Sequence, residues 1–205
     1  MRVAAFAKAP VAGSVKTRLA AELGAEGAAR LASALALRAV ATAIEAGVGP
    51  VELWCSPDAR HPFFESCARR FGVALRVQSG DDLGARMEHA ADDAIARHSP
   101  IIVIGTDCPA LDAATLRAAA VQLRGHDAVF VPAEDGGYVL VGLSKGIPGL
   151  FAGIEWGGSG VMQATRERLV HARARWLELD PLWDVDRPED YARMRREGLA
   201  LEMDP

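Results

Sequence analysis

The chain has 205 residues, 50% of them hydrophobic and 24% charged, which predicts one globular domain with one buried core over residues 1–205. Its formal net charge of −4 gives no general reason to expect nucleic acid or an anionic membrane as a partner. No apolar run approaches the ~18 residues that cross a bilayer, and Lys8 and Pro10 stand where a signal peptide would be apolar. We therefore expect a cytoplasmic protein without a membrane partner.

Short apolar runs alternate along the chain with longer Ala-, Leu- and Arg-rich stretches of helical period. This alternation is typical of an α/β fold with a mostly parallel central sheet between layers of helices. In chain order we predict a strand at 3–7, a helix at 17–47 with a break near Gly24, a strand at 51–55, a helix at 62–71, a strand at 75–78, a helix at 83–97, a strand at 101–105, a helix at 113–123, strands at 128–131 and 138–142, a helix at 160–171, a strand at 175–179 and a helix at 188–197.

Four polar segments rich in Gly or Pro are placed next to the predicted strands. KAPVAGSVKTR follows the first strand, GDDLGARM the third and TDCPAL the fourth, while PAEDGGY lies between the fifth and the sixth. Because the carboxyl ends of parallel strands meet at one edge of an open sheet, and ligands bind there, these segments predict one composite site.

The segment after the first strand is strongly cationic. The first 21 residues contain no carboxylate and four cations, Arg2, Lys8, Lys16 and Arg18. The helix predicted behind this loop would add free N–H groups and about half a positive charge, which favours a di- or triphosphate as the ligand. A solvated cationic turn is the alternative. The loop is not a P-loop, since Val15 rather than glycine precedes Lys16. We expect phosphate contacts from Lys8, Ala9, Pro10, Gly13, Lys16, Thr17 and Arg18.

Two groups of acids suggest a metal site. Asp107 directly follows the buried strand IIVIG, although it could instead cap the next helix. Residues 180–190 hold five acids against one arginine. Magnesium takes one or two protein carboxylates and fills its remaining positions with water and phosphate oxygens. We therefore predict Mg²⁺ or Mn²⁺ bound by Asp107 and Asp186, with Asp184 as the alternative second ligand.

Three further features carry candidate binding residues, two of them for the second substrate and one, Arg86 in the loop GDDLGARM, for the nucleotide. In DGGYVLVGL, Gly136 and Gly137 would let a ligand approach the backbone, and Asp135 could act as a general base; a simple glycine turn is the alternative. Arg86 is available to an anion. Trp156, followed by two glycines, could form an acceptor-side loop or pack on the core.

The three cysteines, Cys55, Cys67 and Cys108, match neither a zinc site nor a CxxC motif. We expect reduced, buried thiols. A nucleophilic Cys108 is the less favoured alternative, because the case for it rests only on its place in the TDCPAL loop.

The motifs KAPVAGSVKTRL, TDCPAL, DGGYVLVGL and DVDRPEDY, in this order, resemble the GT-A nucleotide-diphospho-sugar transferase superfamily. The closest similarity is to bacterial radical-SAM-associated transferases of the arsenosugar-biosynthesis type. The chain also resembles the molybdenum-cofactor and phospholactate guanylyltransferases and the CMP-sugar synthetases. The resemblance implies a Rossmann-like GT-A fold, a three-layer α/β/α sandwich. The sequence departs from the family pattern at Arg187, where threonine is usual, and at Pro109, where a DxD motif would have its second acid.

The same resemblance implies nucleotide contacts from Lys8, Lys16 and Arg18 and metal ligation by Asp107 and Asp186. We expect a metal-dependent transferase that passes a glycosyl group from a nucleotide sugar to a small-molecule acceptor, with Asp135 as acceptor base and Lys16 and Arg18 assisting catalysis. A nucleotidyltransferase that joins an NTP to a phosphorylated small molecule and releases pyrophosphate is the alternative. A nucleotide-binding protein without turnover is a third hypothesis.

Overall fold

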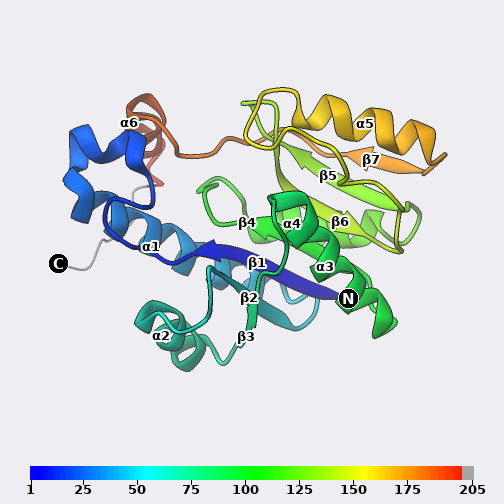
Figure 1. Ribbon diagram of the computed structural model, residues 1–205, viewed down its shortest axis with the longest axis horizontal. Coiled ribbons are helices and arrows are strands. Elements are labelled where there is room, and N and C mark those ends of the chain that lie inside the picture. The colour runs from blue at the N-terminus through cyan, green and yellow to red at the C-terminus, as the bar shows by residue number, and fades with distance from the viewer. Residues whose placement is uncertain (200–205) are drawn as a thin grey trace.

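A seven-stranded mixed sheet forms the centre of the computed structural model, which describes residues 1–199 (Figure 1). The strand order is β3-β2-β1-β4-β6-β5-β7. Strand β6 runs antiparallel to β4 and β5, and all other pairs are parallel. The strands are β1 (Arg2–Lys8), β2 (Val51–Ser56), β3 (Ala74–Val77), β4 (Ile101–Gly105), β5 (Ala128–Pro132), β6 (Tyr138–Leu143) and β7 (Trp176–Glu178).

Every predicted helix is present, with bounds that differ from the prediction by at most one residue, when η1 and α1 are taken together. The first begins as a short 3₁₀ turn, and its predicted break is confirmed at Gly24, whose φ of 69° and ψ of 166° are not helical. Glycine tolerates this conformation at no steric cost. The helical elements are η1 (Thr17–Leu19), α1 (Ala20–Ala46), α2 (Pro62–Phe71), α3 (Leu83–Ala96), α4 (Ala113–Gln122), α5 (Val161–His171) and α6 (Pro188–Arg196).

Helices cover both faces of the sheet because its strands are apolar on both sides. On β1, Val3 and Ala5 belong to the apolar cluster under α1, α2 and α4. Their neighbours Ala4 and Phe6 belong to the cluster under α3 and α5. Successive side chains of a strand point to opposite faces, so one continuous apolar run serves two cores. The predicted three-layer α/β/α arrangement is confirmed.

The expectation that no segment is long and apolar enough to cross a membrane is corrected by Thr17–Ala46. This segment has the length and composition of a membrane span, with a mean hydropathy of 1.3 in its most apolar window. Its apolar character has another cause here. Small residues of α1 such as Ala36, Ala39 and Val40 are buried in the cluster on the sheet. Short side chains let this helix lie close to the strands, and it packs as a core helix of the sandwich.

A third apolar cluster holds the end of the described chain against α1. Trp183, Val185 and Met194 pack with Leu31 and Leu35, and α6 lies beside the start of α1 in Figure 1. The backbone N–H of Val185 also donates to the carbonyl of Asp107, at 2.9 Å. This packing brings residues 184–186 to the carboxyl edge of the central strands.

Candidate functional site

Three adjoining pockets form one groove at the carboxyl edge of the sheet. We call them the basic section, of about 490 Å³, the acidic section, of about 530 Å³, and the apolar section, of about 190 Å³. Asp186 lines both the basic and the acidic sections. Asp135 and Asp184 line both the acidic and the apolar sections. Leu83 and Gly105 line both the basic and the apolar sections. Because the pockets share these walls, a substrate could span all three.

The loop between β1 and η1 supplies the cations of the basic section. Lys8 Nζ donates to the carbonyl of Ser14 at 2.9 Å, which closes the loop. Lys16 adopts a left-handed conformation, with φ of 48° and ψ of 39°, and its side chain is only 5% exposed. In the described part of the chain, the lining of the groove does not include Ala9, Pro10, Gly13 or Thr17. These residues shape the loop that carries Lys8 and Lys16.

The helix behind this loop differs from the prediction. The 3₁₀ turn η1 follows the loop directly, so the α-helix begins at Ala20 and not at Thr17. The loop therefore lacks the long, regular helix whose N-terminus we expected at Thr17. The side chains of Lys8, Lys16 and Arg18 are the principal positive charges at this place.

Asp107 and Asp186, which are distant in the sequence, both line the basic section. Lys16 Nζ lies 2.7 Å from Asp107 Oδ1, and Arg18 forms an ion pair with Asp186. The two carboxylates are about half exposed, at 53% and 46%. Two of the predicted phosphate ligands, Lys16 and Arg18, are therefore each paired with a predicted metal ligand. A phosphate with its metal ion could take up both sets of charges together.

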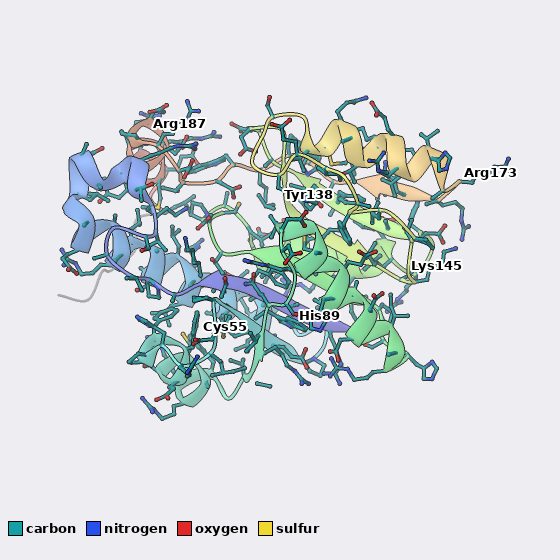
Figure 2. All side chains as sticks on the ribbon, in the orientation of Figure 1. Cys55, His89, Tyr138, Lys145, Arg173 and Arg187 are labelled. Carbon is teal, nitrogen blue, oxygen red and sulfur yellow. The ribbon has the colours of Figure 1, made fainter. Side chains whose placement is uncertain are left out.

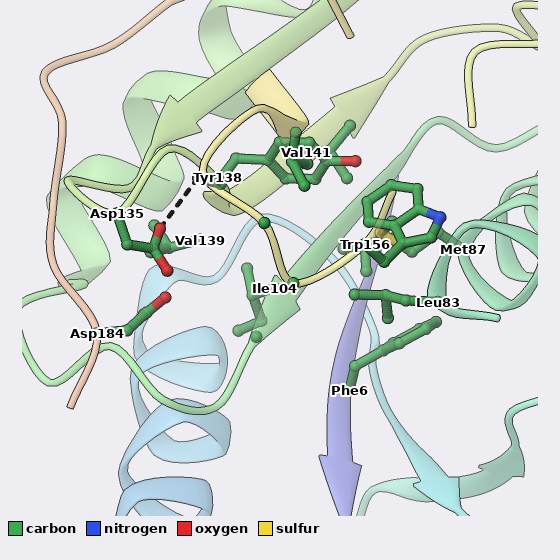
Figure 3. Close-up of a pocket in the computed structure, with 16 residues that line it drawn as sticks. Phe6, Leu83, Met87, Ile104, Asp135, Tyr138, Val139, Val141, Trp156 and Asp184 are labelled. Atoms are coloured by element: carbon green, nitrogen blue, oxygen red, sulfur yellow. Dashed lines mark hydrogen bonds between the residues drawn. The ribbon is translucent and has the colours of Figure 1, made fainter. Parts of the chain in front are cut away.

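The carboxyl group of Asp184 lies near that of Asp135 (Figure 3). Burial, followed by the charge of Asp107, raises the pKa of Asp184 to about 7. Asp135 and Asp186 raise this pKa further, while Lys16 opposes the shift. The charges of three other carboxylates thus act on Asp184, so a cation bound beside Asp184 would be stabilised by nearby negative charge.

The side chains fit magnesium only as a partner of a phosphate ligand. Within residues 1–199 no group of three or more His, Cys, Asp or Glu side chains is placed to hold a metal ion by itself. Asp107 and Asp186 provide the one or two carboxylate ligands that Mg²⁺ commonly takes from a protein, with phosphate and water completing the octahedron. This donor set is compatible with a cation that arrives with a nucleotide.

The loop between β5 and β6 carries Asp135 at the junction of two sections. Asp135 Oδ1 accepts a hydrogen bond from the backbone N–H of Gly137 at 3.0 Å, and Gly137 lines the apolar section (Figure 3). Gly136 is outside the lining. Its φ is +94°, and a Cβ there would lie 2.0 Å from the carbonyl oxygen of Ser159. Gly136 therefore allows another backbone segment, rather than the ligand we expected, to come close.

Trp156 forms a wall of the apolar section. Its ring lies against Gly84, where a Cβ would come within 2.7 Å of the indole. The ring also contacts Tyr138 and Phe151, with centroids 6.3 and 6.4 Å away. Trp156 thus packs on the core and also lines the groove, and its role on the acceptor side stays a prediction.

Arg86 lies in the first turns of α3 and lines the basic section. Its guanidinium donates to the carbonyl of Gly80 at 3.0 Å and to Ser56 Oγ at 3.3 Å. Ser56 and Gln78 also line this section, and sequence reasoning missed both. Their places at the carboxyl ends of β2 and β3 were the available signal, because that edge of the sheet carries the site.

Cys108 is buried, with 6% of its surface exposed. Burial, with a further contribution from Asp184, raises the pKa of its thiol to about 12. A nucleophilic cysteine needs a lowered pKa and access to solvent. The structure supports a packing role for Cys108, as it does for Cys55 and Cys67, which are also buried free thiols.

The model of the family described as "Uncharacterized protein conserved in bacteria (DUF2064)" matches residues 39–158. No curated protein matches the chain. A solved structure from Desulfovibrio desulfuricans G20, provisionally described as a nucleotide-diphospho-sugar transferase, is 31% identical, with a TM-score of 0.83 over 91% of this chain and 82% of that one.

Two more distant structures share the fold. A nucleotidyl transferase from Methanothermobacter thermautotroptrophicus has 20% identity and a TM-score of 0.63, over 96% of this chain and 97% of that one. The 4-diphosphocytidyl-2C-methyl-D-erythritol synthase from Anaerococcus prevotii has 9% identity and a TM-score of 0.65, over 98% and 97%. The predicted nucleotidyltransferase-like α/β fold is confirmed.

Proposed function

The chain belongs to the DUF2064 family, and we propose that it transfers a glycosyl group from a nucleotide sugar to a small acceptor with the help of Mg²⁺ or Mn²⁺. The observation that carries this proposal is the pairing of Lys16 with Asp107 and of Arg18 with Asp186 in one groove. Such a groove offers cations for a diphosphate and carboxylates for the cation that accompanies it. The 31% identical structure described as a nucleotide-diphospho-sugar transferase supports the same assignment.

The nucleoside diphosphate would lie in the basic section. Lys8, Lys16 and Arg86 line this section, and Arg18 reaches Asp186 at its border with the acidic section. The glycosyl group would lie in the acidic section, where carboxylates accept hydrogen bonds from sugar hydroxyls. The acceptor would then approach Asp135, at the junction with the apolar section.

Asp107 and Asp186 would hold the metal ion, with Asp184 as the nearby alternative for the second position. When bound, the ion supplies positive charge that stabilises the departing diphosphate. In the reaction, the bond between the anomeric carbon and the oxygen of the β-phosphate breaks, and that oxygen leaves with the electron pair. The acceptor oxygen forms the new bond, and its proton passes to the Asp135 carboxylate. Lys16 and Arg18 neutralise the phosphate oxygens as the charge develops.

The experiment is to incubate the full chain with Mg²⁺ or Mn²⁺ and UDP-, GDP- or dTDP-sugars, or with each NTP, in the presence of candidate acceptors. Free nucleoside diphosphate formed only with an acceptor supports glycosyl transfer. Pyrophosphate formed only with an NTP and a phosphorylated acceptor would refute glycosyl transfer and support nucleotidyl transfer instead. The several cations around the basic section also favour nucleotidyl transfer. Nucleotide binding by calorimetry without any product would indicate a protein that has lost turnover.

The narrower resemblance to arsenosugar-type transferases, the domain bounds 1–205 and a cytoplasmic location stay predictions. The roles of the individual side chains are likewise proposals, which the variants described below test one at a time.

A further inference from the structure

The apolar section differs in character from the rest of the groove. Phe6, Met87, Val141 and Trp156 contribute apolar walls. Only two charged side chains line it, and both are the carboxylates Asp135 and Asp184. Within the described residues 1–199 no lysine, arginine or histidine lines this section. The chemistry of the walls therefore selects against an anion.

We propose that the apolar section binds the acceptor through a compact, uncharged apolar group of about the size of an aromatic ring, and that it excludes phosphorylated acceptors. The inference rests on the proposed function and adds the class of the second substrate. A phosphate placed here would be desolvated beside two carboxylates without a cation from the lining, which is strongly unfavourable. An apolar group would instead displace water from apolar walls.

The size of the section sets the size of the group. Its volume is about 190 Å³, and a dry protein cavity of about 150 Å³ binds benzene. The section therefore holds a single ring with a short substituent. A larger acceptor would have to extend into the acidic section, past Asp135.

The position of the section places the acceptor at the proposed reaction centre. Asp135 and Asp184 form its border with the acidic section, where the glycosyl group would lie. A hydroxyl group carried on the bound ring would point to this border, within reach of the proposed base. The nearby cation Lys16 lines the basic section instead and is paired with Asp107.

Close backbone and ring packing holds the walls of the apolar section in place. Gly84 allows the indole of Trp156 to lie directly on the backbone of α3. Gly136 allows the loop that contains Ser159 to lie directly on the loop between β5 and β6. The ring of Trp156 packs against those of Tyr138 and Phe151, with centroid distances of 6.3 and 6.4 Å. A ring-shaped ligand would meet preformed aromatic surface, at little cost in reorganisation.

The test compares two probes that share a ring and differ in charge. Benzyl alcohol and benzyl phosphate are titrated into the full chain with Mg²⁺ and a saturating nucleoside diphosphate that fills the basic section, and binding is followed by ligand-observed saturation-transfer NMR. We expect benzyl alcohol to bind and benzyl phosphate to bind at least tenfold more weakly. Equal or tighter binding of benzyl phosphate would overturn the proposal.

Two tryptophan variants show where the probe binds. Trp156→Ala should weaken benzyl alcohol binding about tenfold. Trp176→Ala is the matched control, because Trp176 is also partly buried against the same apolar cluster but lies on β7, outside the lining. Its binding of benzyl alcohol should equal that of the wild type. Equal binding by all three proteins, with folding checked by circular dichroism, would also overturn the proposal.

Calorimetry with Mg²⁺ and UDP, GDP, CDP, ADP or dTDP separates this proposal from the proposed function. A protein that binds a nucleoside diphosphate with metal but prefers benzyl phosphate would refute only the acceptor assignment. A protein that binds none of these nucleotides would refute the transferase proposal instead, and with it the acceptor inference that rests on it.

Discussion

The ammonium group of Lys16 lies 2.7 Å from Oδ1 of Asp107 and joins a proposed phosphate ligand to a proposed metal ligand. Lys16 is almost fully covered, whereas Asp107 is half exposed. Metal alone must compete with Lys16 for Asp107, and phosphate alone must compete with Asp107 for Lys16. A metal–nucleotide complex satisfies both groups at once, so metal and nucleotide should favour each other's binding.

The variant Lys16→Met removes the ammonium and keeps an apolar stem in the buried position. We expect Mn²⁺ alone to bind about fivefold more tightly, since a partly exposed ion pair contributes up to ~1 kcal/mol. Binding of a nucleoside diphosphate with Mg²⁺ should weaken by about tenfold or more, because a hydrogen bond to a charged group is lost. Isothermal titration calorimetry measures both affinities.

Lys145→Met is the matched control for this variant. Lys145 pairs with Asp127 at 3.0 Å, far from the groove toward the other end of the molecule (Figure 2). The Lys145→Met variant should bind Mn²⁺ and the nucleoside diphosphate with the same affinities as the wild type. If Lys16→Met binds metal and nucleotide as the wild type does, the Lys16–Asp107 ion pair has no part in binding either of them.

Asp107→Ala should abolish turnover while preserving the fold. We expect a loss of at least about 100-fold, since even residues that only orient a metal ligand contribute ~10–100-fold. Product formation with saturating Mn²⁺ and nucleotide sugar measures the effect, and circular dichroism checks the fold. Retention of wild-type activity by this variant would remove Asp107 from the proposed metal site.

Asp112→Ala, five residues further on, should affect stability instead of activity. Asp112 caps α4, and its Oδ1 accepts from the backbone N–H of Thr115 at 2.7 Å. Losing such a cap lowers the free energy of unfolding by ~1 kcal/mol. Urea denaturation near neutral pH measures this difference, and unchanged stability would contradict the assignment of Asp112 as a cap.

The same cap predicts a pH dependence. Hydrogen bonds from the Thr115 backbone and side chain hold the pKa of Asp112 below its usual value. Its charge therefore stabilises the fold above the unfolded pKa of ~3.9, and this contribution is lost as pH falls through the lower folded pKa. The difference between wild type and Asp112→Ala should shrink in urea titrations below about pH 4. A constant difference over that range would show that ionisation of Asp112 does not matter.

Gly136→Ala tests the close contact between two loops that border the groove. A Cβ would clash with Ser159, and the φ of +94° disfavours any side chain. We expect the free energy of unfolding to fall by about 2–4 kcal/mol, from backbone strain and overpacking together. Gly125→Ala is the control, because its Cβ would meet only the Gln122 carbonyl, at 3.9 Å. Similar denaturation midpoints for both variants would contradict the predicted clash.

The sequence predicted the order and type of the elements because their signals are local. Apolar runs such as IIVIG are buried on both faces of the sheet, and Gly24 interrupts its helix as expected. The antiparallel direction of β6 was not predicted, although the loop between β5 and β6 is too short for the crossover that a parallel pair needs. The loop between β5 and β6 still reaches the predicted edge, because it leaves the carboxyl end of β5.

The site was predicted less completely, because contacts between distant residues leave no local pattern. Lys16, Asp107 and Asp186 stand in recognisable motifs and do line one groove. Their pairing as two salt bridges follows from tertiary packing alone. The ring-sized apolar section was missed for the same reason, since its walls come from β1, α3, β6 and the loop before α5.

The third apolar cluster has a consequence for biosynthesis. Leu31 and Leu35 of α1 are translated well before Trp183 and Val185, which pack on them. The nascent chain can form β1 to β4 while this leucine patch is still uncovered and Arg18 has not met Asp186. The groove can therefore form only after residues 184–186 have been synthesised, because Asp184 and Asp186 line it.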